Sequence, residues 1–242
     1  TLTAGKTRWY GGILANSGYL VVQNVQFENS TAYYGGAISN NGTLSLESCA
    51  FTNNKASYGA AIYNRTNGIL TISGNVAESN AANNHGGFLY SSGVSVDVYN
   101  TIFNQNKANN RGGVFYFAGG TNTVELANFT DNTARNYGGI AYNTSTATFK
   151  NVTISGSSAA YGGSFVNTGS LTIEESSISD GNAVYGGGVY NRSTGTLIVS
   201  GLTATNNEAV TYGGFLYNFG TSQLTDSDFI SNTSQNRAGA IY

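Results

Sequence analysis

Residues 34–54 carry the pattern that decides the fold, Tyr-Gly-Gly-Ala-Ile-Ser-Asn-Asn-Gly-Thr-Leu-Ser-Leu-Glu-Ser-Cys-Ala-Phe-Thr-Asn-Asn. An aromatic residue and two glycines precede apolar residues, an asparagine, a glycine-containing turn, an alternating segment and Phe-x-x-Asn. The same order recurs along the chain, with pairs of small residues that begin at Gly11, Gly35, Gly59, Gly86, Gly112, Gly138, Gly162, Gly186, Gly213 and Ala238. The steps between pairs are 24, 24, 27, 26, 26, 24, 24, 27 and 25 residues. A fixed period of this length is typical of a solenoid.

Each copy also contains a short segment in which apolar and polar residues alternate. The apolar members are Leu44 and Leu46, Leu70 and Ile72, Val96 and Val98, Val124 and Leu126, Leu171 and Ile173, and Leu197 and Val199. A period of two predicts strands, and no segment has apolar residues at helical spacing. One coil cannot bury its inward side chains alone, whereas stacked coils share a core. The sequence therefore predicts an all-β, right-handed parallel β-helix of about ten coils of 24–27 residues, with residues 1–242 forming a single segment of a longer repetitive chain.

Equivalent positions of successive copies are expected to form columns along this helix. The residue two places after the small pair is apolar in every copy, from Leu14 to Ile241, and should point inward. Its neighbour should point outward and is most often tyrosine, which predicts a contact stripe of Tyr63, Tyr90, Tyr116, Tyr142, Tyr190 and Tyr217. Packing of these rings on one another would also explain them without a ligand. The next position should form a ladder of amides at a turn, from Asn16, Asn40, Asn64, Asn143, Asn167, Asn191 and Asn218.

Two motifs carry a resemblance to a known family. Tyr34-Gly-Gly-Ala-Ile and Phe51-Thr-Asn-Asn resemble the Gly-Gly-Ala-Ile and Phe-x-x-Asn repeats of chlamydial polymorphic outer membrane proteins, the Pmp-like repeats. They are equally similar to adhesin-like repeats of methanogenic archaea. The resemblance covers essentially the whole chain and implies a surface passenger or stalk with a right-handed β-helical body, often in adhesion. It implies no catalytic residues, because the shared motifs are structural.

Composition limits the classes of partner. Of the 242 residues, 40% are hydrophobic and 9% are charged, and the net charge is −2, so we expect a folded chain. A near-neutral chain without clustered cations is not typical of nucleic-acid binding. No stretch approaches the roughly 20 apolar residues of a membrane-spanning helix. The single Cys49 is expected to be a buried, inert thiol.

The acidic residues are the place to look for an enzyme site, because polysaccharide-cleaving β-helices exist and glycoside hydrolysis uses paired carboxylates. Glu174 and Glu175 are adjacent and should face opposite sides, whereas Asp226 and Asp228 could share a face. No nearby Arg or Lys completes a lyase-like set with the aspartates. His85, the only histidine, replaces tyrosine before a glycine pair, and one His with one Cys makes neither a zinc site nor a nucleophile pair. We therefore predict no catalytic residue, no metal and no cofactor.

These features together favour a non-enzymatic, extracellular or cell-surface role. The chain is expected to be a structural or adhesive β-helix, either a stalk or a component of an assembling filament or sheath. Because the repeat runs to Ile241-Tyr242 without a polar cap, we expect self-association or contact with other surface proteins, with glycans as a further class of partner. An alternative function is a carbohydrate-binding or carbohydrate-cleaving β-helix, since aromatic side chains also suit sugars.

Overall fold

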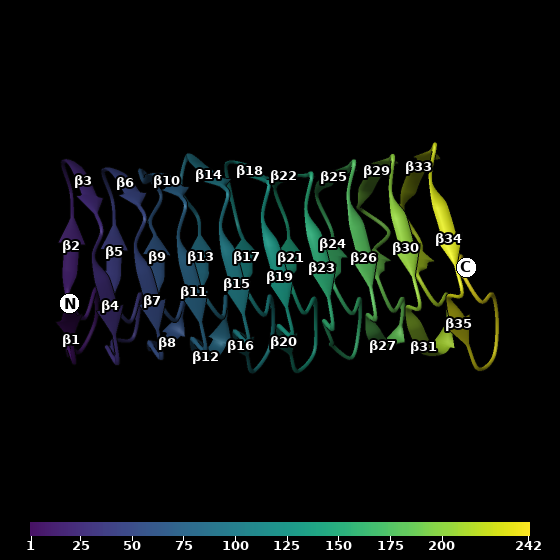
Figure 1. Cartoon of the computed structure of the whole chain (residues 1–242), viewed down its shortest axis with the longest axis horizontal. Coiled ribbons are helices and arrows are strands. Elements are labelled where there is room, and N and C mark those ends of the chain that lie inside the picture. Colours follow the sequence, from purple (N-terminus) through teal and green to yellow (C-terminus); the bar gives the residue numbers. More distant parts are fainter.

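The chain forms a rod in which successive turns of the backbone lie side by side (Figure 1). The computed structural model describes residues 1–242 and contains 35 strands and no helix. All sheets are parallel, and the chain winds as a right-handed β-helix of about nine turns. This confirms the predicted fold class. Ten copies of the motif give about nine turns, because the copy that begins at Ala238 adds a single bridge from Leu216 to Ile241.

Three long parallel sheets form the main sides of the rod, and each turn of the chain adds one strand to each of them. Sheet 1 follows the small-residue pairs and consists of β2 (Leu14–Asn16), β5 (Ile38–Asn40), β9 (Ile62–Asn64), β13 (Leu89–Ser91), β17 (Phe115–Phe117), β21 (Ala141–Asn143), β24 (Phe165–Asn167), β28 (Val189–Asn191) and β32 (Leu216–Asn218). Sheet 2 holds the alternating segments, which are β3 (Tyr19–Gln23), β6 (Thr43–Glu47), β10 (Ile69–Ser73), β14 (Ser95–Tyr99), β18 (Thr121–Glu125), β22 (Thr146–Lys150), β25 (Ser170–Glu174), β29 (Thr196–Ser200) and β33 (Thr221–Thr225).

The third long sheet contains the phenylalanine of Phe-x-x-Asn, and a short fourth sheet closes the coil. Sheet 3 consists of β1 (Leu2–Thr3), β4 (Gln26–Glu28), β7 (Ala50–Thr52), β11 (Val76–Glu78), β15 (Ile102–Asn104), β19 (Asn128–Thr130), β23 (Thr153–Ser155), β26 (Ser177–Ser179), β30 (Thr203–Thr205) and β34 (Asp228–Ile230). Sheet 4 is in two pieces, β8 (Lys55–Tyr58), β12 (Ala81–His85), β16 (Lys107–Ala108) and β20 (Thr133–Ala134), then β27 (Asn182–Tyr185), β31 (Glu208–Tyr212) and β35 (Thr233–Ser234).

Left-handed backbone conformations turn three of the four corners of each coil. At the corner between sheet 4 and sheet 1 the first residue of the small pair has a positive φ, for example 64° at Gly35. A Cβ on the second glycine, Gly36, would collide with the carbonyl oxygen of Ala60 in the next coil. The pair therefore serves both purposes of glycine, a left-handed turn and a close approach of backbones. The corners before and after sheet 3 each use one left-handed residue, such as Asn24 and Asn29.

A left-handed corner also makes one prediction wrong, that Leu126 is an inward strand position. Leu126 does not alternate inward with Val124, because it occupies the left-handed corner between sheets 2 and 3 with a φ of 53° and is 42% exposed. The inward partner of Val124 is Asn122, which pairs with Val96 in the preceding coil. A period of two predicted the strand but not the residue at which it ends.

Apolar side chains fill the interior in columns. The column two places after the small pair is buried from Ile38 to Leu216, as predicted, and a second column contains stacked phenylalanines from sheet 3. Phe27 and Phe51 stack at 4.8 Å with 7° between their planes. Parallel pairing in register places these rings one above the other, so each ring of the pair covers one face of the other.

The phenylalanine column has a gap at Ala77, which a ring from another strand fills. Phe88, just after a glycine pair in the next coil, lies 5.5 Å from Phe51 and 5.3 Å from Phe103, edge-on to both. The sheet 3 column has a second alanine at Ala204, and there too a ring that follows a glycine pair, Phe215, lies in the interior. The Phe215 ring lies over Gly188. The third glycine of Gly186-Gly187-Gly188 therefore makes room for an interior ring.

Candidate interaction surface

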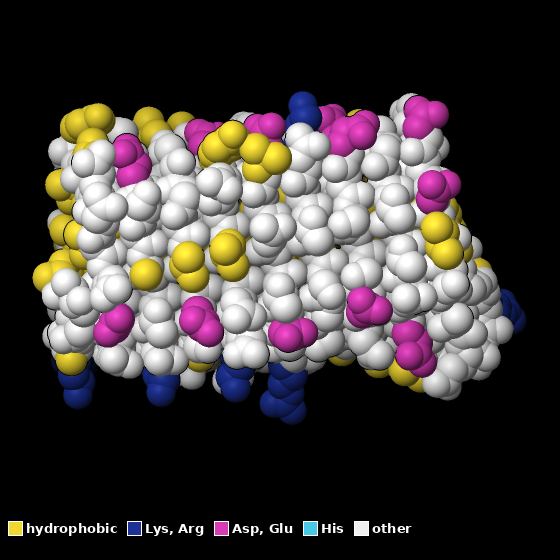
Figure 2. Space-filling view, viewed as in Figure 1, with side chains coloured by type: hydrophobic (Ala, Val, Ile, Leu, Met, Phe, Trp, Pro, Cys, Tyr) yellow, Lys and Arg dark blue, Asp and Glu magenta, His cyan; other side chains and the backbone are white.

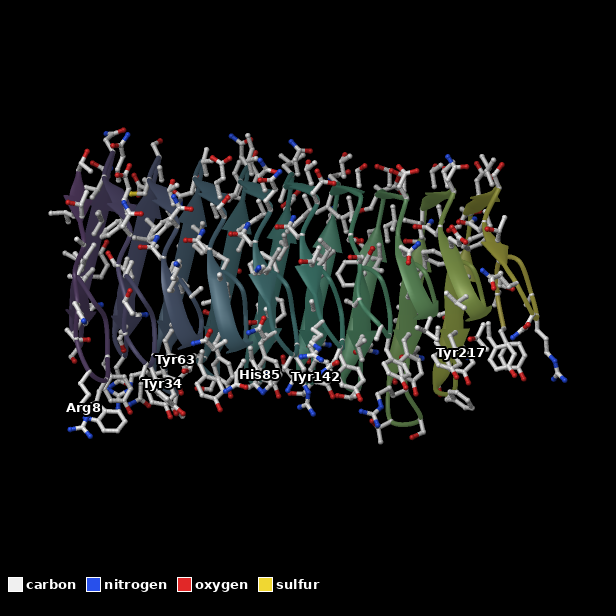
Figure 3. All side chains as sticks on the ribbon, turned by 90° about the horizontal axis from the view of Figure 1, so that it is seen from below. Arg8, Tyr34, Tyr63, His85, Tyr142 and Tyr217 are labelled. Carbon is white, nitrogen blue, oxygen red and sulfur yellow. The ribbon has the colours of Figure 1, made fainter.

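Two adjacent columns of aromatic and cationic side chains run along the corner between sheets 4 and 1 (Figure 3). The sheet column is the outward position of sheet 1, where register joins Ser39, Tyr63, Tyr90, Tyr116, Tyr142, Val166, Tyr190 and Tyr217. The corner column is the position before each small pair, where coil-to-coil pairing joins Tyr10, Tyr34, Tyr58, His85, Arg111, Tyr137, Tyr161, Tyr185, Tyr212 and Arg237. We call these two columns the aromatic face.

Tyrosines of the sheet column stack on one another. The ring centres of Tyr90 and Tyr116 are 4.8 Å apart with 8° between the planes, and those of Tyr116 and Tyr142 are 5.4 Å apart with 3°. These distances follow the spacing of about 4.8 Å between hydrogen-bonded strands. Neighbouring rings therefore cover one another's faces, and the surface presents ring edges and phenol hydroxyls.

Each tyrosine of the sheet column also packs on the corner residue of the preceding coil. Tyr63 lies 4.8 Å from Tyr34, and Tyr116 lies 4.9 Å from His85. This stagger covers the side chains, so most of the six predicted tyrosines are half-buried and Tyr142 is 4% exposed. The structure thus brings the predicted tyrosines together as a packed surface rather than as a row of free side chains.

An arginine spans the first interior coil in which the sheet column has no tyrosine. That coil holds Ser39, and Arg65 reaches across it from the following coil. The guanidinium carbon of Arg65 lies 4.7 Å from the centre of the Tyr10 ring, two coils back. A guanidinium over an aromatic ring is a favourable cation–π contact.

A second arginine spans the second interruption in the same way. Val166 interrupts the column, and Arg192 reaches across its coil to donate a hydrogen bond of 3.5 Å from Nη1 to Oη of Tyr142. Like Arg65, Arg192 is the second residue after a tyrosine of the sheet column. We call Arg65 and Arg192 the arginine clasps.

The two clasps belong to a longer repeat of five coils. They are 192 − 65 = 127 residues apart, and the spacing series 24, 24, 27 occurs twice in the sequence. Each 27-residue step contains a longer turn after sheet 1, closed by a 2.7 Å hydrogen bond from Gly68 N to the Arg65 carbonyl or from Gly195 N to the Arg192 carbonyl. The clasps were missed from sequence, although this repetition of step lengths was the signal that could have found them.

His85 and Arg111 replace tyrosine in the corner column and stay within the stack. The Arg111 guanidinium carbon lies 4.8 Å from the centre of the Tyr142 ring. Burial, together with the positive charge of Arg111, lowers the pKa of His85 to about 4. His85 is therefore neutral near pH 7, and the positive charge of the face comes from its arginines.

The predicted asparagine ladder lies at the turn between sheets 1 and 2. Asn16 Nδ2 donates to Asn40 Oδ1 at 2.8 Å, and Asn40 Nδ2 donates to Asn64 Oδ1 at 2.8 Å. Asn40 Nδ2 also donates to the Gly42 carbonyl at 3.0 Å, which fixes the turn. The same coil-to-coil bonds, of 2.8 to 2.9 Å, join Asn143, Asn167, Asn191 and Asn218.

A side-chain exchange interrupts this ladder in the fifth coil. Phe117 occupies the asparagine position and is buried in the core, while Asn122 occupies an inward position of sheet 2. Asn122 Nδ2 donates to Ser145 Oγ at 3.0 Å and to the Thr146 carbonyl at 3.0 Å. An amide and an apolar ring have thus changed places; the amide nitrogen still bonds across the turn, whereas Asn122 Oδ1 is buried without a hydrogen-bond partner.

The asparagine of Phe-x-x-Asn forms a second, fully buried ladder that the sequence reading did not assign. Asn80 Nδ2 donates to Asn106 Oδ1 at 2.9 Å and to the Phe51 carbonyl at 2.9 Å, while its Oδ1 accepts from Asn54 Nδ2 at 3.0 Å. The ladder continues from Asn106 to Asn132, and a separate pair joins Asn207 to Asn232. These amides have their donors and acceptors satisfied, as buried polar groups require.

The acidic candidates are not drawn together. Glu174 ends β25, Glu175 is the left-handed corner residue after it, Asp226 is the equivalent corner residue, and Asp228 begins β34. Both aspartates are exposed. Cys49 is 2% exposed, and burial raises the pKa of its thiol, as expected of a buried cysteine.

Comparison of the chain with protein-family models, with curated proteins and with solved structures finds no match. The surface has no pocket, and no three side chains of His, Cys, Asp or Glu gather as a metal site would require. No helix of the length and apolar character needed for a membrane crossing is present. The aromatic face is therefore the candidate functional site.

Proposed function

We propose that residues 1–242 are a non-enzymatic structural or adhesive segment of a cell-surface protein, in which a rigid β-helix displays the aromatic face. The observation that carries the proposal is this face, a nearly unbroken row of tyrosine and arginine side chains along the outside of a core that is complete without it. Tyrosine and arginine are enriched at the centres of protein contacts. A row of them on an outer surface supports a role in contact.

The interior supports a role as a spacer. Coils are joined by backbone bonds in every sheet and by buried amide ladders, such as Asn54 to Asn80 to Asn106. The sheets and amide ladders join each coil to the next one, so length can be added without changing the cross-section. A rod of this kind can hold a contact surface away from the body to which it is attached.

The aromatic face also favours the carbohydrate-binding alternative. No observation favours cleavage, because the paired acidic candidates lie on exposed corners and strand ends rather than across a cleft. A reducing-sugar assay with Asp226→Asn as the comparison tests cleavage. Turnover that this substitution abolishes would overturn the non-enzymatic assignment.

Adhesion is tested with beads that carry the chain. We expect beads coated with residues 1–242 to attach to cells or to isolated cell envelopes, and beads coated with a Tyr90→Ser/Tyr116→Ser/Tyr217→Ser variant to lose most of that attachment. An equal number of substitutions on the outer side of sheet 2, Thr71→Ala/Thr123→Ala/Thr172→Ala, is the matched control. Equal attachment of both variants would remove the aromatic face from the proposal.

Localisation is tested separately by immunogold labelling of the source cells with an antibody against residues 1–242. We expect gold particles on the outer surface or on material outside the cell. Particles confined to the cell interior would contradict the proposed function, whatever the beads bind.

A further inference from the structure

The aromatic face carries positive charge and no negative charge, whereas the other faces of the rod carry charges of both signs. The guanidinium groups of Arg65, Arg111 and Arg237 lie over tyrosine rings of the aromatic face, and that of Arg8 lies over Trp9 beside it. A fifth arginine, Arg192, donates a hydrogen bond to Tyr142. No acidic residue lies on sheet 1, on its turn to sheet 2 or on its glycine corner. The twelve acidic residues lie on sheets 2, 3 and 4 and on the corners beside sheet 3, and Figure 2 shows rows of them on the face over sheet 3. The aromatic face is therefore purely cationic within a chain of net charge −2.

The groups that this face offers to a ligand are hydrogen-bond donors. Along the sheet column the ring faces are occupied by neighbouring rings, as at Tyr90 and Tyr116, so neither a sugar ring nor a nucleobase finds a free aromatic surface there. What remains outward is phenol hydroxyls and guanidinium groups. Burial raises the pKa of Tyr63, Tyr90 and Tyr217, with further elevation from neighbouring tyrosines, so these hydroxyls stay protonated and can donate.

The arginine clasps repeat at a fixed distance. Five coils separate Arg65 from Arg192, and at about 4.8 Å for each coil this is roughly 24 Å along the rod. Both begin the same four-residue turn, and both reach back over the position where a tyrosine is missing. Two equivalent cationic sites in line suit one linear polymer that carries regularly repeated anionic groups.

We infer that the aromatic face binds a linear acidic polysaccharide, with a carboxylate at each arginine clasp and polymer oxygens on the phenol hydroxyls. The inference rests on the proposed function, because it names the partner that the displayed face would contact. A guanidinium takes a carboxylate through two parallel hydrogen bonds, and charge-assisted bonds of this type are the strong ones. One polymer that reaches both clasps gains affinity from the second site without any new contact.

A second copy of this chain and a nucleic acid fit the face less well. The outward column of sheet 2 holds Glu125 and Glu174, but Lys150 lies between them in register and offsets their charge. A nucleic acid carries a phosphate at every nucleotide and relies on bases that stack on free rings. The two clasps are far apart by comparison, and the rings between them, such as Tyr90 and Tyr116, cover one another.

Surface plasmon resonance with immobilised residues 1–242 and polygalacturonate as the probe tests the inference. We expect saturable binding that weakens as salt is raised and that falls about tenfold or more in Arg65→Gln/Arg192→Gln. The matched control, Lys107→Gln/Lys150→Gln, removes the same charge from other faces and should bind like the wild type. Circular dichroism and thermal unfolding of each variant establish that it is folded.

Oligogalacturonates of increasing length test the bivalent arrangement. Affinity should rise steeply once the oligomer spans about 24 Å, and this rise should vanish in either single variant, Arg65→Gln or Arg192→Gln. Carboxyl-reduced polygalacturonate, which is neutral, should not bind. Equal binding of the neutral polymer, or equal losses in the clasp and control variants, would overturn the inference.

Two further outcomes would replace the partner. Tighter binding of poly(dT) than of polygalacturonate would assign the face to nucleic acid, and a dimer in sedimentation that Arg65→Gln/Arg192→Gln dissolves would assign it to a second copy. If beads attach to cells but no acidic polymer binds, the inferred polysaccharide ligand is wrong and the proposed surface role is retained. If the polymer binds while immunogold labelling is confined to the cell interior, the proposed surface role is wrong and the inferred polymer-binding site is retained.

Discussion

Two aromatic stacks run along this rod, one inside and one outside, and each has gaps. Inside, Phe51 is followed by Ala77, and Phe88 from a different strand fills the space. Outside, Tyr142 is followed by Val166, and Arg192 from a different coil covers the interruption. Both stacks use the same coil spacing, with ring centres 4.8 Å apart for Phe27 and Phe51 and also for Tyr90 and Tyr116.

The difference lies in what fills the gap. The interior accepts any apolar group of the right volume, because burial and close packing are all that the position requires. The exterior receives a cation, which packing does not require and which increases the charge of the face. The inner stack is therefore explained by folding alone, whereas the outer stack calls for a partner.

Phe88→Ala should lower the free energy of unfolding by about 3–5 kcal/mol, because it removes a fully buried ring and reopens the gap at Ala77. Chemical denaturation measures the loss. Ile102→Ala, on the outer side of sheet 3 where the side chain is 47% exposed, is the control and should cost far less. A loss below about 1 kcal/mol for Phe88→Ala would mean that the inner stack tolerates its gap.

Asn106→Ala should cost about 3 kcal/mol, because it strips partners from the backbone N–H and side-chain amide of Asn80 and from the Ala77 carbonyl. The same denaturation experiment measures it. Asn128→Ala, at an exposed position of β19, should change stability by less than about 0.5 kcal/mol. Equal effects of the two substitutions would show that the buried amide ladder does not hold the coils together.

His85 should make stability depend on pH. Its folded-state pKa of about 4 lies below the unfolded value of 6.5, so the unfolded chain binds a proton first as pH falls between these values. The unfolding temperature should therefore drop between pH 7 and pH 4.5, and it should drop less in His85→Tyr, which restores the tyrosine of the corner column. Identical pH profiles for the two proteins would contradict burial of His85 in the outer stack.

Arg192→Gln should have the smallest effect, a loss of less than about 1 kcal/mol, because it removes one exposed cation and a long hydrogen bond. Thermal unfolding measures it beside Lys150→Gln, which removes the same charge from sheet 2. A loss as large as that of Phe88→Ala would show that the outer cation serves folding, and the contrast between the stacks would fail.

Much of the fold could be predicted from sequence because the period and the alternation act on every coil. Steps of 24 to 27 residues and inward residues such as Leu44 and Leu46 were sufficient to predict parallel coils with a shared core. The exceptions arise where a residue is used by a different part of the coil. Leu126 sits at a corner, and Phe117 and Asn122 exchange places, because a repeat specifies the volume and the hydrogen bonds of a position rather than the strand that supplies them.

The candidate site was predicted in part. The sheet column of tyrosines followed from alternation, and the position before each small pair, where Tyr, His and Arg occur, could be placed at the surface or at a corner from the repeat. The packing of one column on the other and the clasps depend on contacts between residues one or two coils apart, such as Arg65 with Tyr10. A pattern within one copy does not contain such contacts. The longer repeat of five coils does, since it places the same arginine and the same turn at Arg65 and Arg192.

The two stacks and the paired clasps require equivalent positions to lie over one another at constant spacing, and a distance measurement tests this spacing most directly. Thr71 and Ile198 lie on sheet 2, five paired strands apart in unbroken register. Spin labels on Thr71→Cys and Ile198→Cys, in a chain with Cys49→Ala, should give a narrow double electron–electron resonance distribution centred at roughly 24 Å, apart from the label linkers. A broad distribution, or one centred beyond about 35 Å, would contradict the stacked coils and, with them, the two stacks and the paired clasps.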